Sequence, residues 1–189
     1  ISIDDATRIA GSGFAVYRGK GARLERALIN FLLDTQSGEH GYEEVNVPHV
    51  VKRECMEGTG QLPKFEDDQY GLPKDDLYLI PTAEVPLTNL YRDEILEAKD
   101  LPKTFVAFTP CFRREAGAAG KDTRGLLRVH QFDKVELVEW VHPDESLNEL
   151  EKMRLHIQSL VEKLELPYRT LLMCSKDIGF PHAKQYDVE

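Results

Sequence analysis

The sequence contains no long run of apolar residues. A transmembrane helix needs about 20 consecutive apolar residues, and no stretch of the 189 residues approaches that length. The first ten residues, from Ile1 to Ala10, also lack the basic and then apolar layout of a signal peptide. We therefore expect no membrane partner and a cytoplasmic location.

Cysteines are few, and the common motifs for metal binding, covalent catalysis and phosphate binding are missing from the sequence. Cys55, Cys111 and Cys174 form no CxxC pair, and an odd number of cysteines suits a disulfide framework poorly. The histidines show no HExxH spacing, no serine lies in GxSxG, and the glycine pairs match neither a P-loop nor GxGxxG. We expect reduced, buried cysteines, no metal held by the chain, and no Rossmann or P-loop phosphate site.

Basic residues are outnumbered by acidic ones. The chain has 24 Lys and Arg against 33 Asp and Glu, which gives a formal net charge of −9. This balance argues against a protein that coats nucleic acid indiscriminately. Between Cys111 and Lys134, however, there are six basic and three acidic residues, a local net charge of +3. This stretch predicts contact with an anionic ligand.

What the sequence does contain is an irregular alternation of helix and strand signals, without repeats or low-complexity segments. This organisation predicts one α+β unit in which helices flank an antiparallel sheet. Apolar residues recur at helical spacing from Leu24 to Leu32. The other expected strands are 41–47, ended by Pro48, 77–80, the pair 104–114 and 129–141, and 168–174. The other expected helices are one that starts at Pro86, has Leu87 to Ile95 on its apolar face and ends before Leu101, and one at 147–164 capped by Ser146 with Glu149 or by Asp144. A surface loop is expected at 56–76.

The two longest strand signals predict an antiparallel hairpin around a glycine-rich connection. Side chains alternate between the faces of a strand, so Arg113 and Glu115 share one face, as do Phe132, Lys134 and Glu136 on the partner strand. One interpretation is a ladder of salt bridges on a solvated face. The other is a ligand site, which the local positive charge favours.

A second candidate cluster is the segment from Pro81 to Glu84. If this segment is extended, Thr82 and Glu84 point the same way and offer a hydroxyl and a carboxylate, the groups that bind an α-ammonium and a small polar side chain. The alternative is a helix N-terminus, where Thr82 caps the helix and Glu84 favours its dipole.

These motifs, taken in order, resemble a known family. Phe112 to Glu115, followed by Arg128 to Phe132, resembles motif 2 of the class II aminoacyl-tRNA synthetases, with the pattern F-R-x-E … R-x-x-x-F. The preceding helix and the segment Gly41 to Pro48 resemble motif 1, which that class uses for dimerisation. Three further segments are similar to seryl-tRNA synthetases of the bacterial type, namely Thr59 to Phe65, Thr82 to Glu84, and RVHQFDKVE at 128–136.

The resemblance implies roles for individual residues. It implies that Arg113 is catalytic and binds the α-phosphate of ATP, that Glu115 receives the adenine amino group, and that Phe132 stacks on the adenine. Arg128, Val129, His130 and Gln131 would complete the ATP site. Serine would be bound by Thr82, Ala83, Glu84, Arg113 and Glu136. The loop at 116–125 would reach the acceptor end of the tRNA.

The implied reaction suits these residue types. The carboxylate of serine attacks the α-phosphorus of ATP and gives seryl-adenylate, from which the seryl group passes to tRNA(Ser). Because that carboxylate is already ionised, no general base is needed, and the site supplies alignment and charge stabilisation through Arg113 and Mg²⁺. The resemblance therefore implies ATP and Mg²⁺ as cofactors, and serine, tRNA(Ser) and a second copy of the chain as partners.

The chain also departs from the family pattern. We find no glycine-rich motif 3 with its arginine and no N-terminal helical arm, so we expect residues 1–189 to form a single partial catalytic domain with little activity alone. Two other functions stay open: a non-catalytic binding module of the same fold, and an amino-acid ligase that charges a carrier protein.

Overall fold

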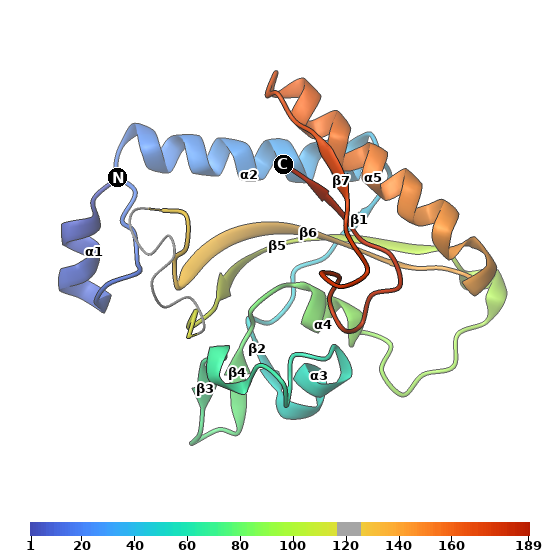
Figure 1. Cartoon of the computed structure of the whole chain (residues 1–189), viewed down its shortest axis with the longest axis horizontal. Helices are drawn as coiled ribbons and strands as arrows, with labels where there is room; N and C mark the ends of the chain where they lie inside the picture. The colour runs from blue at the N-terminus through green and yellow to red at the C-terminus, as the bar shows by residue number, and fades with distance from the viewer. Residues whose placement is uncertain (117–125) are drawn as a thin grey trace.

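A long antiparallel hairpin forms the centre of the molecule (Figure 1). In the computed structural model, which describes residues 1–116 and 126–189, strands β5 (Lys103–Phe112) and β6 (Gln131–Trp140) pair over their full length. The register runs from Lys103 opposite Trp140 to Phe112 opposite Gln131. The short strand β1 (Glu43–Glu44) joins the other edge of β5 in parallel, giving the order β1-β5-β6. The predicted hairpin and the α+β fold class are confirmed.

The two longest helices lie on one side of the hairpin (Figure 1). Helix α2 (Lys20–Gly38) contacts both β5 and β6, and it also contacts α5 (Ser146–Lys163). The predicted periodicity from Leu24 to Leu32 lies inside α2 and is confirmed. Helix α1 (Ile3–Ala10) precedes these elements, and the strands β7 (Thr170–Leu172) and β8 (Tyr186–Val188) form a separate pair. Within the described residues, no helix is long and apolar enough to cross a membrane.

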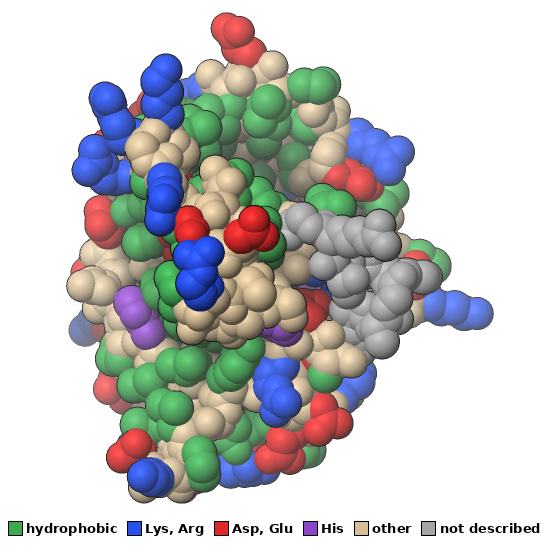
Figure 2. All heavy atoms as spheres, turned by 90° about the vertical axis from the view of Figure 1, so that its left-hand side faces the viewer, with side chains coloured by type: hydrophobic (Ala, Val, Ile, Leu, Met, Phe, Trp, Pro, Cys, Tyr) green, Lys and Arg blue, Asp and Glu red, His purple; other side chains and the backbone are tan. Residues whose placement is uncertain are grey.

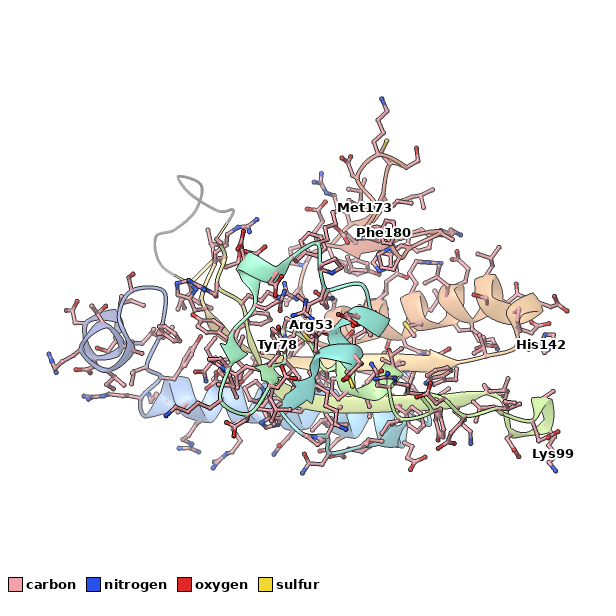
Figure 3. All side chains as sticks on the ribbon, turned by 90° about the horizontal axis from the view of Figure 1, so that it is seen from below. Arg53, Tyr78, Lys99, His142, Met173 and Phe180 are labelled. Atoms are coloured by element: carbon pink, nitrogen blue, oxygen red, sulfur yellow. The ribbon has the colours of Figure 1, made fainter. Side chains whose placement is uncertain are left out.

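A second, smaller layer covers the opposite side of the hairpin. It consists of β2 (Val50–Lys52), α3 (Arg53–Gly58), β3 (Gly71–Leu72), β4 (Leu77–Leu79) and α4 (Glu84–Thr88), with the strands in the order β2-β4-β3. Figure 3 shows Arg53 beside Tyr78 in this layer, where the guanidinium donates to the phenol oxygen at 2.8 Å. Three short 3₁₀ helices complete the described chain, at Glu66–Asp68, Ala98–Asp100 and Pro143–Glu145.

The prediction of a surface loop at 56–76 is wrong. This segment includes the end of α3, a 3₁₀ turn and β3. Met56 is completely buried and Leu62 is 3% exposed, and both belong to a core cluster with Val51, Ile80 and Val85. A few apolar side chains without regular spacing are enough to anchor a segment when a neighbouring strand supplies the partner surface, which periodicity alone does not detect.

The helix predicted from Pro86 to before Leu101 is also wrong in length. Helix α4 ends at Thr88, and the chain then turns, with Asp93 in the left-handed region at a φ of 62°. Leu87 is completely buried, whereas Ile95 is 97% exposed. The apolar spacing therefore extended beyond the single turn that packs against β6.

Other predicted boundaries change by smaller amounts. Helix α5 starts at Ser146 itself, with Glu145 as the N-cap and no side-chain capping bond among the described residues, so neither predicted cap is formed. The carboxylate of Glu149 accepts from Lys152. The predicted strands at 41–47 and 168–174 shorten to β1 and β7. The cysteines are free, but only Cys111 is buried, while Cys174 lies exposed after β7.

Candidate active site

The site is built where the end of β5 meets the start of β6 and the segment before α4. The backbone N–H of Arg113 donates to the carbonyl of His130 at 2.9 Å, which continues the ladder one residue beyond β5. The Arg113 side chain donates from Nε to the carbonyl of Pro81 at 3.2 Å, and its guanidinium carbon lies 5.0 Å from the centre of the Phe132 ring. Arg113 and Phe132 thus share one face of the sheet, as predicted from the alternation of side chains.

A polar cluster lies further along the same face. The hydroxyl of Thr82 donates to Glu136 Oε2 at 2.9 Å and accepts from Lys134 Nζ at 2.7 Å. Lys134 also forms an ion pair with Glu136. Thr82 is 3% exposed, so these contacts lie at the base of the cluster and not on a solvated ladder. The structure therefore joins two predicted groups that are more than 50 residues apart in sequence.

The segment 82–84 is a helix N-terminus and not an extended segment, because Ala83 has helical dihedral angles and Glu84 is the first residue of α4. Thr82 accepts from the backbone N–H of Glu84 at 3.2 Å, as a residue at a helix N-terminus does. Burial raises the pKa of Glu84, and the neighbouring Glu136 raises it further, while Lys134, His182 and Arg113 lower it. Ala83 is completely buried in the core with Val47, Leu87 and other apolar residues, so its side chain offers nothing to a ligand.

A second part of the site lies at the open end of the hairpin. Arg128 donates to Glu115 Oε2 at 3.0 Å, and both residues line a cavity of about 340 Å³. The residues that line this cavity are Gln61, Phe65, Asp68, Gln69, Arg113, Glu115 and Arg128. Glu115 has a φ of 52°, a left-handed conformation that is uncommon for glutamate and that occurs where the chain leaves β5.

The other residues predicted to bind ATP, Val129 to Gln131, do not line this smaller cavity. The backbone N–H of His130 donates to Gly13, and its ring nitrogen Nδ1 lies 3.0 Å from the carbonyl oxygen of Arg113, with Phe14 and Tyr70 beside the ring. His130 therefore fixes the backbone that carries Arg113. Val129, Gln131 and Phe132 line a larger cavity, of about 560 Å³, between α2 and β6. The structure brings together Arg113, Glu115 and Arg128, with Phe132 against Arg113, but it does not bring Val129, His130 and Gln131 into the smaller cavity.

Two of the six basic residues in the predicted positive stretch are ion-paired in the structure. Arg128 bonds to Glu115 and Lys134 to Glu136, whereas Lys121 and Arg124 lie outside the described residues. The predicted tRNA loop at 116–125 also lies outside them, except for Ala116. Figure 2 shows acidic and basic side chains interspersed on the face beside this region.

Sequence reasoning missed several residues of the site. Asp68 accepts from the backbone N–H groups of Arg114 and Ala116, at 2.8 and 2.7 Å, and thereby holds the start of the connection after β5. Gln61 and Phe65 line the smaller cavity. The sequence does point to Gln61 and Phe65, because both lie in the segment Thr59 to Phe65 that resembles the family. Asp68 had no such signal.

Comparison with known proteins identifies the family. The model of the tRNA synthetase class II core domain (G, H, P, S and T) matches residues 64–189. A serine–tRNA ligase of Akkermansia muciniphila is 64% identical over 189 residues, which are 100% of this chain and 44% of that protein. One from Gemmatimonas aurantiaca is 63% identical over 182 residues, 96% of this chain and 43% of that protein.

Solved structures agree with these relatives. The crystal structure of seryl-tRNA synthetase from Pyrococcus horikoshii complexed with ATP superposes with a TM-score of 0.95 at 44% identity, over 100% of this chain and 42% of that one. The cytoplasmic serine–tRNA ligase of Naegleria fowleri in complex with AMP gives a TM-score of 0.94 at 29% identity, over 99% of this chain and 44% of that one.

This chain spans less than half the length of the curated relatives that it matches. Within that span, the family model covers more than half of the chain, and the predicted resemblance to seryl-tRNA synthetases is confirmed by both relatives and structures. The chain belongs to the class II aminoacyl-tRNA synthetase core-domain family, the group for G, H, P, S and T.

Proposed function

We propose that the protein containing this chain is a serine–tRNA ligase, which activates L-serine with ATP and transfers it to tRNA(Ser). The observation that carries the proposal is the adjacency of two polar groups on one sheet face. The cluster of Thr82, Lys134 and Glu136 suits an amino acid, and the Arg113 guanidinium over Phe132 suits a nucleotide phosphate and base. The names of the relatives support serine as the amino acid.

In the first step, a carboxylate oxygen of serine forms a bond to the α-phosphorus of ATP, and the bond from that phosphorus to the leaving pyrophosphate breaks. Negative charge develops on the α-phosphate oxygens, where the guanidinium of Arg113 would stabilise it. Arg113 is held by Pro81 and by the backbone bond to His130, so little reorganisation is required of it. In the second step, a ribose hydroxyl of the tRNA attacks the seryl carbonyl and AMP leaves.

The amino-acid end of the site would select serine by its two polar groups. Glu84 and Glu136 would accept from the α-ammonium and the side-chain hydroxyl, next to Thr82. A site built to bond a hydroxyl leaves buried polar groups unpaired when alanine binds, which is worth about 10⁴-fold or more in discrimination. Because Ala83 is completely buried, it would contribute to this site only through its backbone.

At the nucleotide end, Arg113, Glu115, Arg128 and Phe132 belong to the proposed ATP site, with the adenine near Phe132 and Glu115. Val129 and Gln131 line the larger cavity behind β6, so we propose that they act through the backbone, as His130 does. Mg²⁺ is proposed as the ion of the ATP phosphates. The described residues contain no group of three metal-ligating side chains, and no step is assigned to the ion.

The remaining parts of the proposal concern the whole protein. Residues 1–189 would form part of a catalytic domain, in line with the share of the relatives that they span. Helix α2 and β1 would take part in a homodimer, the loop at 116–125 would meet the tRNA, and the protein would work in the cytoplasm.

The test is serine-dependent exchange of pyrophosphate into ATP by the complete product of the gene that encodes this chain. We expect exchange with serine and none above background with threonine, alanine or proline. Arg113→Ala should abolish it, whereas Lys152→Met on the surface of α5 should not change it. Absence of exchange with every amino acid would favour a non-catalytic binding module. Exchange followed by transfer to a carrier protein instead of tRNA(Ser) would identify a carrier-charging ligase.

A further inference from the structure

Lys134 lies at the centre of the amino-acid end of the site, although no role follows for it from the two-step reaction. It stands in the middle of β6 opposite Thr109, between Phe132 and Glu136 on the same sheet face. Its ammonium donates to Thr82 Oγ1 at 2.7 Å and pairs with Glu136. The side chain is only 31% exposed, so this charge lies largely inside the site.

The ammonium determines the direction in which the Thr82 hydroxyl points its hydrogen. A hydroxyl has one hydrogen to donate and two lone pairs to accept with. Thr82 Oγ1 accepts from Lys134 Nζ and from the backbone N–H of Glu84 at 3.2 Å, so its single hydrogen goes to Glu136 Oε2 at 2.9 Å. Lys134 therefore holds both the hydroxyl and the carboxylate in one arrangement.

Lys134 also balances charge. Glu136 lies close enough to Glu84 that its ionised carboxylate disfavours ionisation of Glu84. Among the described residues, the titratable and charged groups that face Glu84 are Glu136 and Lys134 from β6, Arg113 directly after β5, and His182 from the segment before β8. Burial and Glu136 raise the pKa of Glu84, and Lys134 is first among the groups that lower it.

We propose that Lys134 is a positioning residue of the serine site: it holds Thr82 and Glu136 in the arrangement that receives a small hydroxyl amino acid, and it offsets the negative charge of Glu84 and Glu136. This inference rests on the proposed function. It adds a specificity role for a residue that bonds to the serine-binding side chains and not to the reacting atoms.

The first experiment measures pyrophosphate exchange with Lys134→Met in the complete gene product. We expect the KM for serine to rise about 10- to 100-fold, as for loss of a hydrogen bond from a charged group. The KM for ATP should stay within about twofold, because Lys134 bonds to none of the proposed ATP residues. Without the lysine, Glu84 protonates at higher pH, so the acid limb of kcat/KM for serine should move to higher pH.

Lys134→Gln keeps a donor for Thr82 but removes the charge, so its KM for serine should rise less than that of Lys134→Met while its acid limb moves equally. Lys152→Met is the matched control, since Lys152 pairs with Glu149 on the surface of α5. An unchanged KM for serine in Lys134→Met, an equal rise in both KM values, or an unmoved acid limb would overturn the proposal.

A second measurement does not depend on activity. The carboxyl of Glu84, labelled with ¹³C and assigned through Glu84→Gln, is titrated by NMR in the complete wild-type protein and in Lys134→Gln. We expect its pKa to be higher in the variant, and an equal pKa in both proteins would refute the charge-balancing role. If the wild type shows no serine-dependent exchange, the proposed function fails, whereas this titration still decides the role of Lys134.

Discussion

Replacing Tyr42 with phenylalanine removes one buried hydroxyl from the contact between α2, the hairpin and α5. Tyr42 is 3% exposed, and its hydroxyl donates to Glu139 Oε1 at 2.5 Å and lies 3.2 Å from His156 Nδ1. The other carboxylate oxygen, Glu139 Oε2, is buried without a hydrogen-bond partner among the described residues. In Tyr42→Phe, both oxygens of this carboxylate would lack a donor.

The expected loss of unfolding free energy follows from the loss of this donor to the buried Glu139 carboxylate. Leaving a buried polar group without its partner costs about 1–3 kcal/mol, and for a chain of this length each kcal/mol corresponds to roughly 2–4 °C in Tm. We therefore expect the variant to lose about 2 kcal/mol of unfolding free energy at pH 7.5, with a Tm roughly 4–8 °C lower. Thermal and urea unfolding of the 189-residue chain, followed by circular dichroism, measure both quantities.

The loss should depend on pH. Burial raises the pKa of Glu139 above its unfolded value, and the hydrogen bond from Tyr42 lowers it and so offsets part of this effect. An acid with a raised folded pKa costs stability once pH rises above the unfolded pKa, and this cost grows until the folded pKa is passed. Removing the hydroxyl raises the folded pKa further, so the variant loses most at neutral pH and less near pH 4, where Glu139 is largely protonated in both states.

The matched control is Tyr168→Phe. Its hydroxyl also donates to a glutamate, Glu162 Oε1 at 2.6 Å, but this pair lies at the surface. Water replaces the lost donor there, so no measurable change is expected. An equal loss for Tyr42→Phe at neutral and acid pH, or equal losses in the two variants, would show that the buried carboxylate does not carry the cost and would refute the reasoning.

Three further predictions test other parts of the structure. Met56→Ala should lower the unfolding free energy by about 2–5 kcal/mol in urea titrations, because Met56 is completely buried, while Ile95→Ala at a 97% exposed position should change nothing. Gly13→Ala should cost about 1–3 kcal/mol in the same assay, because Gly13 has a φ of +81° and an added Cβ would lie 2.2 Å from the His130 ring. Its control is Gly38→Ala, where an added Cβ would have no neighbour within 4 Å among the described residues. Phe132→Ala should raise the KM for ATP about 5- to 100-fold in pyrophosphate exchange, as for loss of one stacked base, whereas Phe180→Ala, at a position that is 82% exposed on the projecting segment in Figure 3, should not.

Local patterns in the sequence were sufficient for the longest elements. The helical spacing from Leu24 to Leu32 predicts α2, and the alternation on either side of the glycine-rich connection predicts β5 and β6. In these long elements the apolar pattern repeats over many residues, so a few residues that depart from it do not obscure the period. The pairing of Arg113 with Phe132 follows from the same alternation. Motif order then pointed to the family.

Only the tertiary structure decided the contacts between distant segments. Periodicity extended α4 to Ile95 and left Met56 in a loop, because it does not report which apolar residues meet a partner surface. The hydrogen bonds of Lys134 and Glu136 to Thr82 join segments 52 and 54 residues apart. The burial of the Ala83 side chain in a core cluster was likewise visible only from its neighbours in space. The sequence by itself determined which chemical groups this protein has and which strands carry them. The packing of the hairpin against the segment before α4 decided which of those groups meet, because a contact depends on distance in space and not on distance along the chain.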